Sequence, residues 1–180
     1  KESREDLAKI ADLISAPIVG YRAPSFSFTQ ESTWILDCLQ ELGFLYSSSI
    51  MPAKNPLFSF PDAPTNPFLH HNGLVEFPCP VMRLPGIGNI AFAGGIYLRY
   101  LPSWLVRRGL RSQVGAWTYI HPYDLDPEEP FIKYEGVSTL FSVLLWVNRS
   151  STSQKLKYLM ENINIAQPFA TRLQKMNLAP

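Results

Sequence analysis

The sequence contains little of what marks three common classes of protein. Its 16 Lys and Arg and 15 Asp and Glu leave a net charge of +1, whereas domains that bind nucleic acid usually carry a basic patch or a strongly positive net charge. Its two cysteines, Cys38 and Cys79, lie within apolar periodic segments, so we expect buried thiols rather than a disulfide or a metal framework. No apolar run approaches the ~18 residues of a membrane span, and no signal segment opens the chain. We therefore expect no nucleic acid partner and no transmembrane segment, and we favour a cytoplasmic over a periplasmic location.

The residues that are present indicate a globular domain with a substantial core. The chain has 180 residues, of which 46% are hydrophobic and 17% charged. It begins without methionine and already within an amphipathic helical pattern, in which Leu7, Ile10 and Leu13 share one face. We therefore expect that an amino-terminal part of the protein is missing.

Helices and short strands alternate in the first quarter of the chain. Residues 17–21 are apolar and partly β-branched, as in a buried strand, and residues 44–46 resemble a second one. Between them, Thr29 can cap a helix whose apolar residues recur at helical spacing and which Gly43 ends. This order predicts an α/β fold with a parallel sheet.

The rest of the chain is more irregular, because prolines interrupt it. In chain order, we expect a proline-rich loop over residues 52–67, edge-strand pieces over residues 74–84, a helix beginning near Pro102 and a strand over residues 116–120. We expect a last helix that begins with a capping box of Ser151 and Gln154 and buries Leu159 and Met160. The tail after Gln167 is expected to be frayed.

Two strand exits carry side chains suited to a binding site. Arg22 follows the first strand within Arg-Ala-Pro-Ser, and His121 follows the strand over residues 116–120. Ligands of α/β folds gather at the carboxyl ends of strands, so we expect both side chains to face one cleft. Ser25 is the first residue after Pro24 whose N–H can point at an oxyanion. Residue types alone leave open a purely structural histidine and a solvated arginine.

Other polar residues suggest less chemistry. The adjacent pair His70 and His71 does not converge easily on one ion, which favours a loop or surface position over metal binding. The acidic residues of the segment after His121 are expected to form a solvated turn; they are Asp124, Asp126, Glu128 and Glu129.

Three segments carry a resemblance to a known family. "GYRAPSFSFTQESTWILDCLQELGFLYSSSI" resembles the third-motif region of NodB-type polysaccharide deacetylases, and "AGGIYLRYLPSWLVRRGL" and "YIHPYDLDPEEP" resemble the exosortase-associated branch with a DUF3473 extension. The resemblance implies the carboxy-terminal part of a distorted (β/α) barrel over residues 1–125, with the DUF3473-type segment from about residue 50. Residues 126–180 would form a carboxy-terminal extension with a final helix.

The resemblance also implies an activity, the metal-dependent hydrolysis of N-acetyl groups on the amino sugars of an exopolysaccharide. Arg22 would form a wall of the sugar groove and orient a catalytic carboxylate, and the Ser25 N–H would help to hold the oxyanion. His121 would protonate the departing amine. The substrate contacts would be Pro24, Ser25, Tyr97 and Arg99.

The chain departs from the family pattern in two respects. The aspartate pair and the His-x-x-x-His motif, which hold a divalent metal such as zinc, are expected in the missing amino-terminal segment. Ser47 stands where close relatives commonly have aspartate. We therefore expect the isolated chain to be inactive and to bind no metal by itself.

Two alternatives remain open at this point. One is a non-catalytic carbohydrate-binding or scaffold remnant, in which Tyr97, Trp104 and Trp117 stack on sugar faces instead of packing in a core. The other is an allantoinase-like amide hydrolase of the same superfamily, with the same fold and another substrate.

Overall fold

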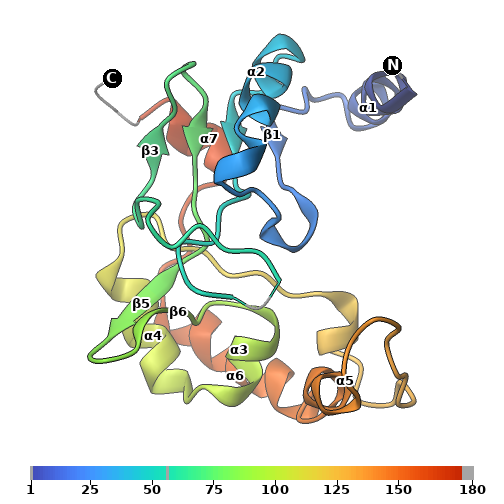
Figure 1. Ribbon diagram of the computed structural model, residues 1–180, viewed down its shortest axis with the longest axis vertical. Helices are drawn as coiled ribbons and strands as arrows, with labels where there is room; N and C mark the ends of the chain where they lie inside the picture. The colour runs from blue at the N-terminus through green and yellow to red at the C-terminus, as the bar shows by residue number, and fades with distance from the viewer. Residues whose placement is uncertain (1, 56, 176–180) are drawn as a thin grey trace. The chain divides into compact units, whose positions relative to one another are not determined.

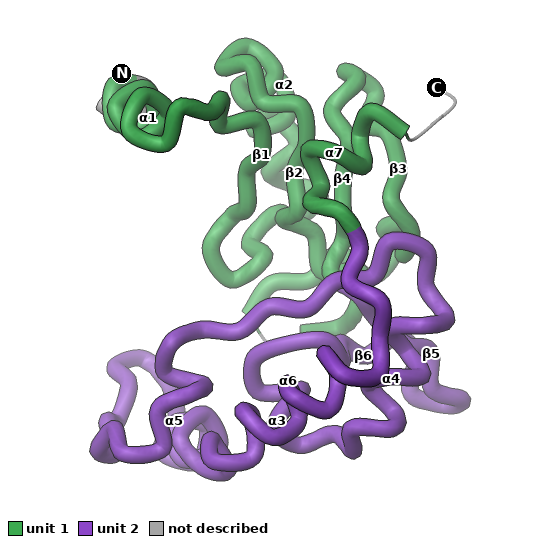
Figure 2. Tube along the Cα trace, turned by 180° about the vertical axis from the view of Figure 1, so that it is seen from behind, with its two compact units in different colours: residues 1–79, 167–180 green, residues 80–166 purple. Residues whose placement is uncertain are grey.

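The computed structural model describes residues 2–55 and 57–175, and its elements are mixed helices and small sheets. The chain divides into two compact units (Figure 2). The first unit contains the residues up to 79 together with those from 167 onward, and the second contains residues 80–166. Each unit is described by itself.

A four-stranded sheet organises the first unit (Figure 1). Its strands are β1 (Gly20–Tyr21), β2 (Tyr46–Ser47), β3 (Phe68–Leu69) and β4 (Val75–Glu76), in the order β1-β2-β4-β3. β1, β2 and β4 run parallel, and β3 pairs antiparallel with β4. The carboxyl ends of three parallel strands therefore meet at one edge.

Helical segments complete the first unit. They are α1 (Glu2–Ile14), the 3-10 turns η1 (Pro24–Phe26) and η2 (Gln30–Ser32), α2 (Trp34–Glu41) and α7 (Phe169–Leu173). α2 buries Leu36 and Leu39 in a cluster with residues of the loops around the sheet, namely Phe28, Phe44, Ile50, Ala63 and Leu74. Gly43 follows α2 with a φ of 81°, a left-handed conformation that glycine adopts without steric cost.

The second unit combines one hairpin with helices. Its elements are β5 (Val81–Leu84), β6 (Gly88–Ala91), α3 (Gly95–Tyr100), α4 (Ser103–Ser112), the 3-10 turn η3 (Pro122–Asp124), α5 (Thr139–Trp146) and α6 (Ser150–Asn162). β5 and β6 form an antiparallel pair. The core cluster contains Phe92, Ala93, Leu98, Val106 and Leu159. No helix of the described residues is long and apolar enough to cross a membrane.

The mixed α/β prediction is confirmed in its coarse form. A helix connects two parallel strands near the predicted positions, although each strand has only two residues. The described residues form no closed barrel. The division predicted at residue 125 concerned family segments and stays a prediction.

One strand prediction is wrong and one is confirmed in part. Residues 116–120 form no strand, since Tyr119 makes only an isolated bridge, to Gly94. Of the edge-strand pieces expected over residues 74–84, β5 pairs on one side only, with β6, whereas β4 lies between β2 and β3. Pro78 and Pro80 follow the end of β4, so the missing N–H groups do not interrupt its ladder.

The expectations for the helices near the carboxyl end also need correction. α6 begins at Ser150 without a side-chain cap, and it exposes Met160 to 58% while burying Leu159. In the tail expected to be frayed after Gln167, residues 169–173 form α7, where Phe169 stacks on Phe77 with ring centroids 4.2 Å apart; residues 176–180 lie outside the described residues. α5 was not predicted at all, although Ser138 caps it by accepting the Phe141 N–H.

The contact of α4 with Phe92 generates a test of the second unit. A Cβ added at Gly109 would lie 2.6 Å from Cε2 of the fully buried Phe92 ring. Alanine would gain about 1 kcal/mol of helix propensity, but overpacking costs about 1–3 kcal/mol. We expect Gly109→Ala to lower the free energy of unfolding in urea, whereas the exposed Arg108→Ala leaves it nearly unchanged. A gain of stability would show that the Phe92 ring yields.

The two thiols differ, so only one of the two burial predictions is confirmed. Cys79 is buried, and its burial raises the pKa to about 12 against the opposing charge of Arg22. Cys38 is exposed.

Because the thiolate is the reactive form, we expect one thiol equivalent to react with an aromatic disulfide reagent at pH 8, and the second only after unfolding. Cys38→Ser should abolish the native reaction, and two equivalents reacting together in the folded chain would contradict the buried position.

Candidate functional site

Arg22 lies at the carboxyl end of β1 and contacts the loop after β2. Its Nε donates to the Ser48 carbonyl at 3.2 Å, and its Nη2 donates to Ser48 Oγ at 3.0 Å. The Ala23 N–H donates to Ser49 Oγ at 2.9 Å. Two neighbouring parallel strands thus hold one cation at their common edge, where α/β folds bind ligands.

The turn after Arg22 is strained. Ser25 has a φ of 56° and Phe26 a φ of 54°, both in the left-handed region that residues other than glycine rarely adopt. Such conformations cost about 1–3 kcal/mol each and persist only where the surroundings hold them. Here Pro24 fixes the entry, Phe26 is buried, and Ser25 is exposed. Ser25 is therefore exposed to solvent in a backbone conformation that is unfavourable by itself.

Sequence reasoning missed Glu76, which is completely buried at the end of β4. Its Oε1 accepts the backbone N–H groups of Ser49 at 2.7 Å and Ile50 at 3.0 Å, and its Oε2 lies 3.5 Å from Nε2 of His70. The carboxylate ties β4 to the loop that Arg22 also contacts. A single acidic residue in an apolar run was the available signal.

Ser47 is also buried, at the position where aspartate was expected by resemblance. Its hydroxyl donates to Ser49 Oγ at 2.9 Å, and that oxygen accepts the Ala23 N–H. A chain of hydroxyl groups therefore supports the backbone of the Arg-Ala-Pro-Ser turn.

In the second unit, His121 precedes the 3-10 turn η3. The exposed fraction of its side chain is 48%, and its ring stacks on Tyr123 with centroids 5.0 Å apart. Asp124 Oδ2 accepts the His121 backbone N–H at 3.0 Å and lies 3.3 Å from His121 Nδ1. Burial, and next the charge of Asp124, raise the pKa of Tyr123. The imidazole is thus accessible on one side and held on the other.

Asp124 corrects the expectation of a solvated acidic turn. It is fully buried, because the 3-10 turn directs it inward, whereas Asp126 is exposed and accepts the N–H groups of Glu128 and Glu129. Arg99 is fully buried too, with Nε 3.4 Å from Asp124 Oδ1. Its burial points Arg99 toward a supporting role rather than a contact with sugar.

The remaining predicted contacts lie nearer the surface. Pro24 is exposed, Tyr97 and Trp117 are half-buried, and Trp104 is exposed to 62%. Trp104 is therefore not a core residue. The substrate-binding roles of Pro24, Ser25 and Tyr97 stay predictions.

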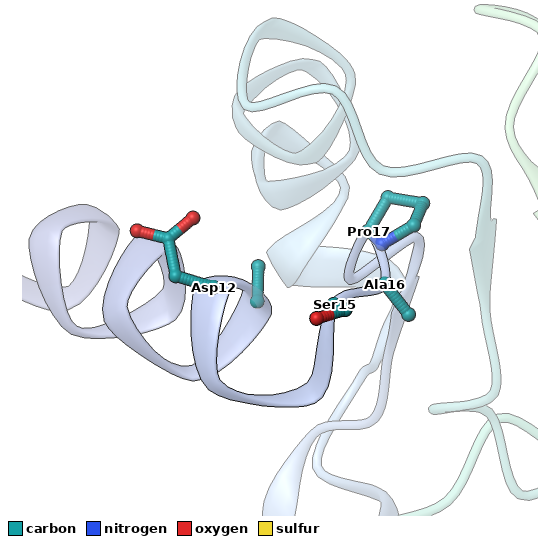
Figure 3. A pocket seen from close by; sticks show the side chains of 5 residues that line it. Asp12, Ser15, Ala16 and Pro17 are labelled. Carbon is teal, nitrogen blue, oxygen red and sulfur yellow. The ribbon is translucent and has the colours of Figure 1, made fainter.

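The predicted cleft joins residues of two units. Arg22 belongs to the first unit and His121 to the second, so their expected meeting in one cleft stays a prediction. A depression in the first unit lies instead at the end of α1 (Figure 3). The depression is lined by Ala11, Asp12, Ser15, Ala16 and Pro17. None of these is a predicted site residue.

Each of the three histidines faces one carboxylate. His70 pairs with Glu76, His71 with Asp37 at 3.8 Å, and His121 with Asp124. Throughout residues 2–55 and 57–175, no three His, Cys, Asp or Glu side chains come together as a metal site. The His, Cys, Asp and Glu side chains of this part of the chain therefore do not fit the metal that the resemblance implies.

The separation of these pairs generates a prediction about zinc. Tight Zn²⁺ sites need three or four converging ligands, so we expect the 180-residue chain to show no stoichiometric binding in isothermal titration calorimetry. A control peptide with a known zinc site should bind under the same conditions. Sub-micromolar, stoichiometric binding by the chain would refute the prediction.

Comparison with known proteins gives one positive result. The family model described as a domain of unknown function, DUF3473, matches residues 48–170, which is more than half of the chain. No curated protein and no solved structure matches the chain. The matched range includes Glu76, Arg99, His121 and Asp124, but not Arg22 or Ser25. The chain therefore belongs to the DUF3473 family, a family without an assigned function.

Proposed function

We propose that this chain is part of a polysaccharide deacetylase that hydrolyses N-acetyl groups on the amino sugars of an exopolysaccharide. The observation that carries the proposal is the strained turn after β1. Ser25 and Phe26 lie in the left-handed region, at an energetic cost, and the residues before them are fixed by the hydrogen bonds from Arg22 to Ser48 and from the Ala23 N–H to Ser49. The resemblance of this segment to NodB-type deacetylases gives that strain a purpose.

The turn suits stabilisation of a negatively charged intermediate. When water attacks the acetamide carbonyl carbon, the carbonyl oxygen becomes an oxyanion, and a fixed backbone N–H can donate to it. In the proposal, the exposed Ser25 supplies this donor. Arg22, whose guanidinium is held by Ser48, forms the wall beside it and orients the carboxylate that takes the proton from water.

His121 has the exposure required of a general acid. In the proposed step its protonated imidazole gives a proton to the nitrogen of the tetrahedral intermediate while the C–N bond breaks. The products are a free amino sugar and acetate, and His121 is left neutral. Because an unprotonated amine is a poor leaving group, this transfer acts mainly on the transition state.

A second candidate function is carbohydrate binding without catalysis. The exposed indole of Trp104 favours it, since aromatic rings at a surface can stack on the apolar faces of sugars. This candidate needs no general acid, so kinetics distinguish it from the first.

The test is steady-state kinetics on an N-acetylated oligosaccharide with the protein expressed from its complete open reading frame. We expect His121→Ala to lower kcat by ~10²- to 10⁴-fold with little change in KM, as for loss of a general acid. Arg22→Ala should change both constants, because it alters the groove as well as the carboxylate. His71→Ala is the matched control, since that histidine is exposed and lies in a turn.

Two results would contradict the proposal. A His121→Ala protein with normal kcat and raised KM would show that His121 binds sugar instead of delivering a proton. A complete protein that binds oligosaccharide but releases no acetate would favour the second candidate, and Trp104→Ala should then weaken binding.

A further inference from the structure

We propose that Asp124 is the positioning residue of His121 and that the buried Arg99 anchors it. The geometry is independent of the function proposed above, whereas its catalytic consequence rests on that function. The carboxylate is supplied from the turn that His121 itself begins, and not from position 47, where a buried serine stands.

The two oxygens of Asp124 are directed to different partners. Oδ2 accepts the backbone N–H of His121 at 3.0 Å and lies 3.3 Å from Nδ1 of its ring, while Oδ1 faces Arg99. Because one oxygen contacts both the backbone and the ring of His121, it restricts the rotation of the side chain. Pro122 at the start of η3 fixes the backbone between the two residues.

A hydrogen bond between His121 Nδ1 and Asp124 selects one form of the imidazole. A carboxylate oxygen can only accept, so Nδ1 must carry the proton in that bond, and Nε2 of the neutral ring is left to bind and release the proton that is exchanged with a ligand. The ring also faces the Asp124 N–H in a capping box, and if Nδ1 accepted from that group the proton would lie on Nε2. The tautomer therefore distinguishes a ring positioned by the carboxylate from a ring that only caps the turn.

Arg99 forms an ion pair with the carboxylate, in which Nε and Oδ1 lie 3.4 Å apart without a hydrogen bond. Its Nη1 donates to the carbonyls of Leu145 at 2.6 Å and Val147 at 3.3 Å, at the carboxyl end of α5. The Arg99 carbonyl in turn accepts from Asn148 Nδ2 at 2.8 Å. Because each charge of this buried pair offsets the cost of burying the other, removal of one charge alone is expected to be destabilising.

Other charged groups in this unit do not compete for His121. Tyr123 covers one face of the imidazole, and Arg149 lies over the Tyr123 ring, 5.4 Å from its centroid. Arg149 pairs with Glu129. Asp124 is therefore the carboxylate that the described contacts place at the His121 ring.

The first test reads the tautomer directly in the 180-residue chain. Two-bond ¹H–¹⁵N correlation NMR of ¹⁵N-labelled histidine, recorded at a pH where the ring is neutral, assigns the proton to one nitrogen. We expect His121 to be mainly the Nδ1–H form and the exposed His71 to show the Nε2–H form that predominates in free histidine. Mainly Nε2–H at His121 would overturn the proposal without any variant being made.

The second test removes the charge of Asp124. Asp124→Asn retains a side-chain oxygen that can accept the backbone N–H, and we expect it to shift His121 toward the Nε2–H form. Asp126→Asn makes the same change at an exposed position of the same loop and should leave the tautomer unchanged. If Asp124→Asn keeps the Nδ1–H form, Asp124 has no positioning role.

Kinetics of the complete protein then separate the two proposals. We expect Asp124→Asn to lower kcat at least tenfold with little change in KM, and Asp126→Asn to do neither. If the tautomer is as expected but His121→Ala retains normal kcat, the deacetylase proposal fails while the positioning of His121 stands. If His121→Ala lowers kcat but neither the tautomer nor kcat responds to Asp124→Asn, the positioning proposal alone fails.

Discussion

Among the described residues, each unit contains a fully buried carboxylate that accepts at least one backbone N–H group. Glu76 holds the loop after β2 in the first unit, and Asp124 holds the turn η3 in the second. A buried charge is costly unless it is hydrogen-bonded, so the polypeptide around each carboxylate must keep its donors in place. The polar residues near Arg22 and His121 depend on these two constraints, because Ser49 and His121 are among the donors.

The sequence predicted correctly that Arg22 follows a strand, whereas His121 follows none, because residues 116–120 form no strand. Periodicity was enough for α2 and Gly43 for its end, because these are local effects of the backbone. The predicted cap was wrong, since Thr29 caps the 3-10 turn η2 and α2 begins at Trp34 without a side-chain cap. The strand expected over residues 116–120 failed because pairing partners are distant in sequence, and the segment makes only an isolated bridge, between Tyr119 and Gly94. The burial of Asp124 was missed for the same reason, since burial is decided by elements distant in sequence that no local pattern revealed.

Replacement of an expected aspartate by Ser47 changes the balance of the first unit. Arg22 is held by a carbonyl and a hydroxyl of Ser48, and the hydroxyls of Ser47 and Ser49 continue this support toward Ala23. Neutral hydroxyl groups can both donate and accept, so they shape the turn without neutralising the guanidinium. Ser47, Ser48 and Ser49 therefore add no negative charge beside Arg22.

The left-handed backbone at Ser25 has a consequence for the evolution of this segment. β-Branched side chains are poorly tolerated in that conformation, whereas glycine relieves it and asparagine or aspartate accommodates it. Without selection on the turn, glycine should therefore be favoured at position 25, because it removes the backbone strain; the fold would be more stable and the turn less rigid. A serine that persists there in homologous sequences would be a signature of selection for rigidity at the expense of stability.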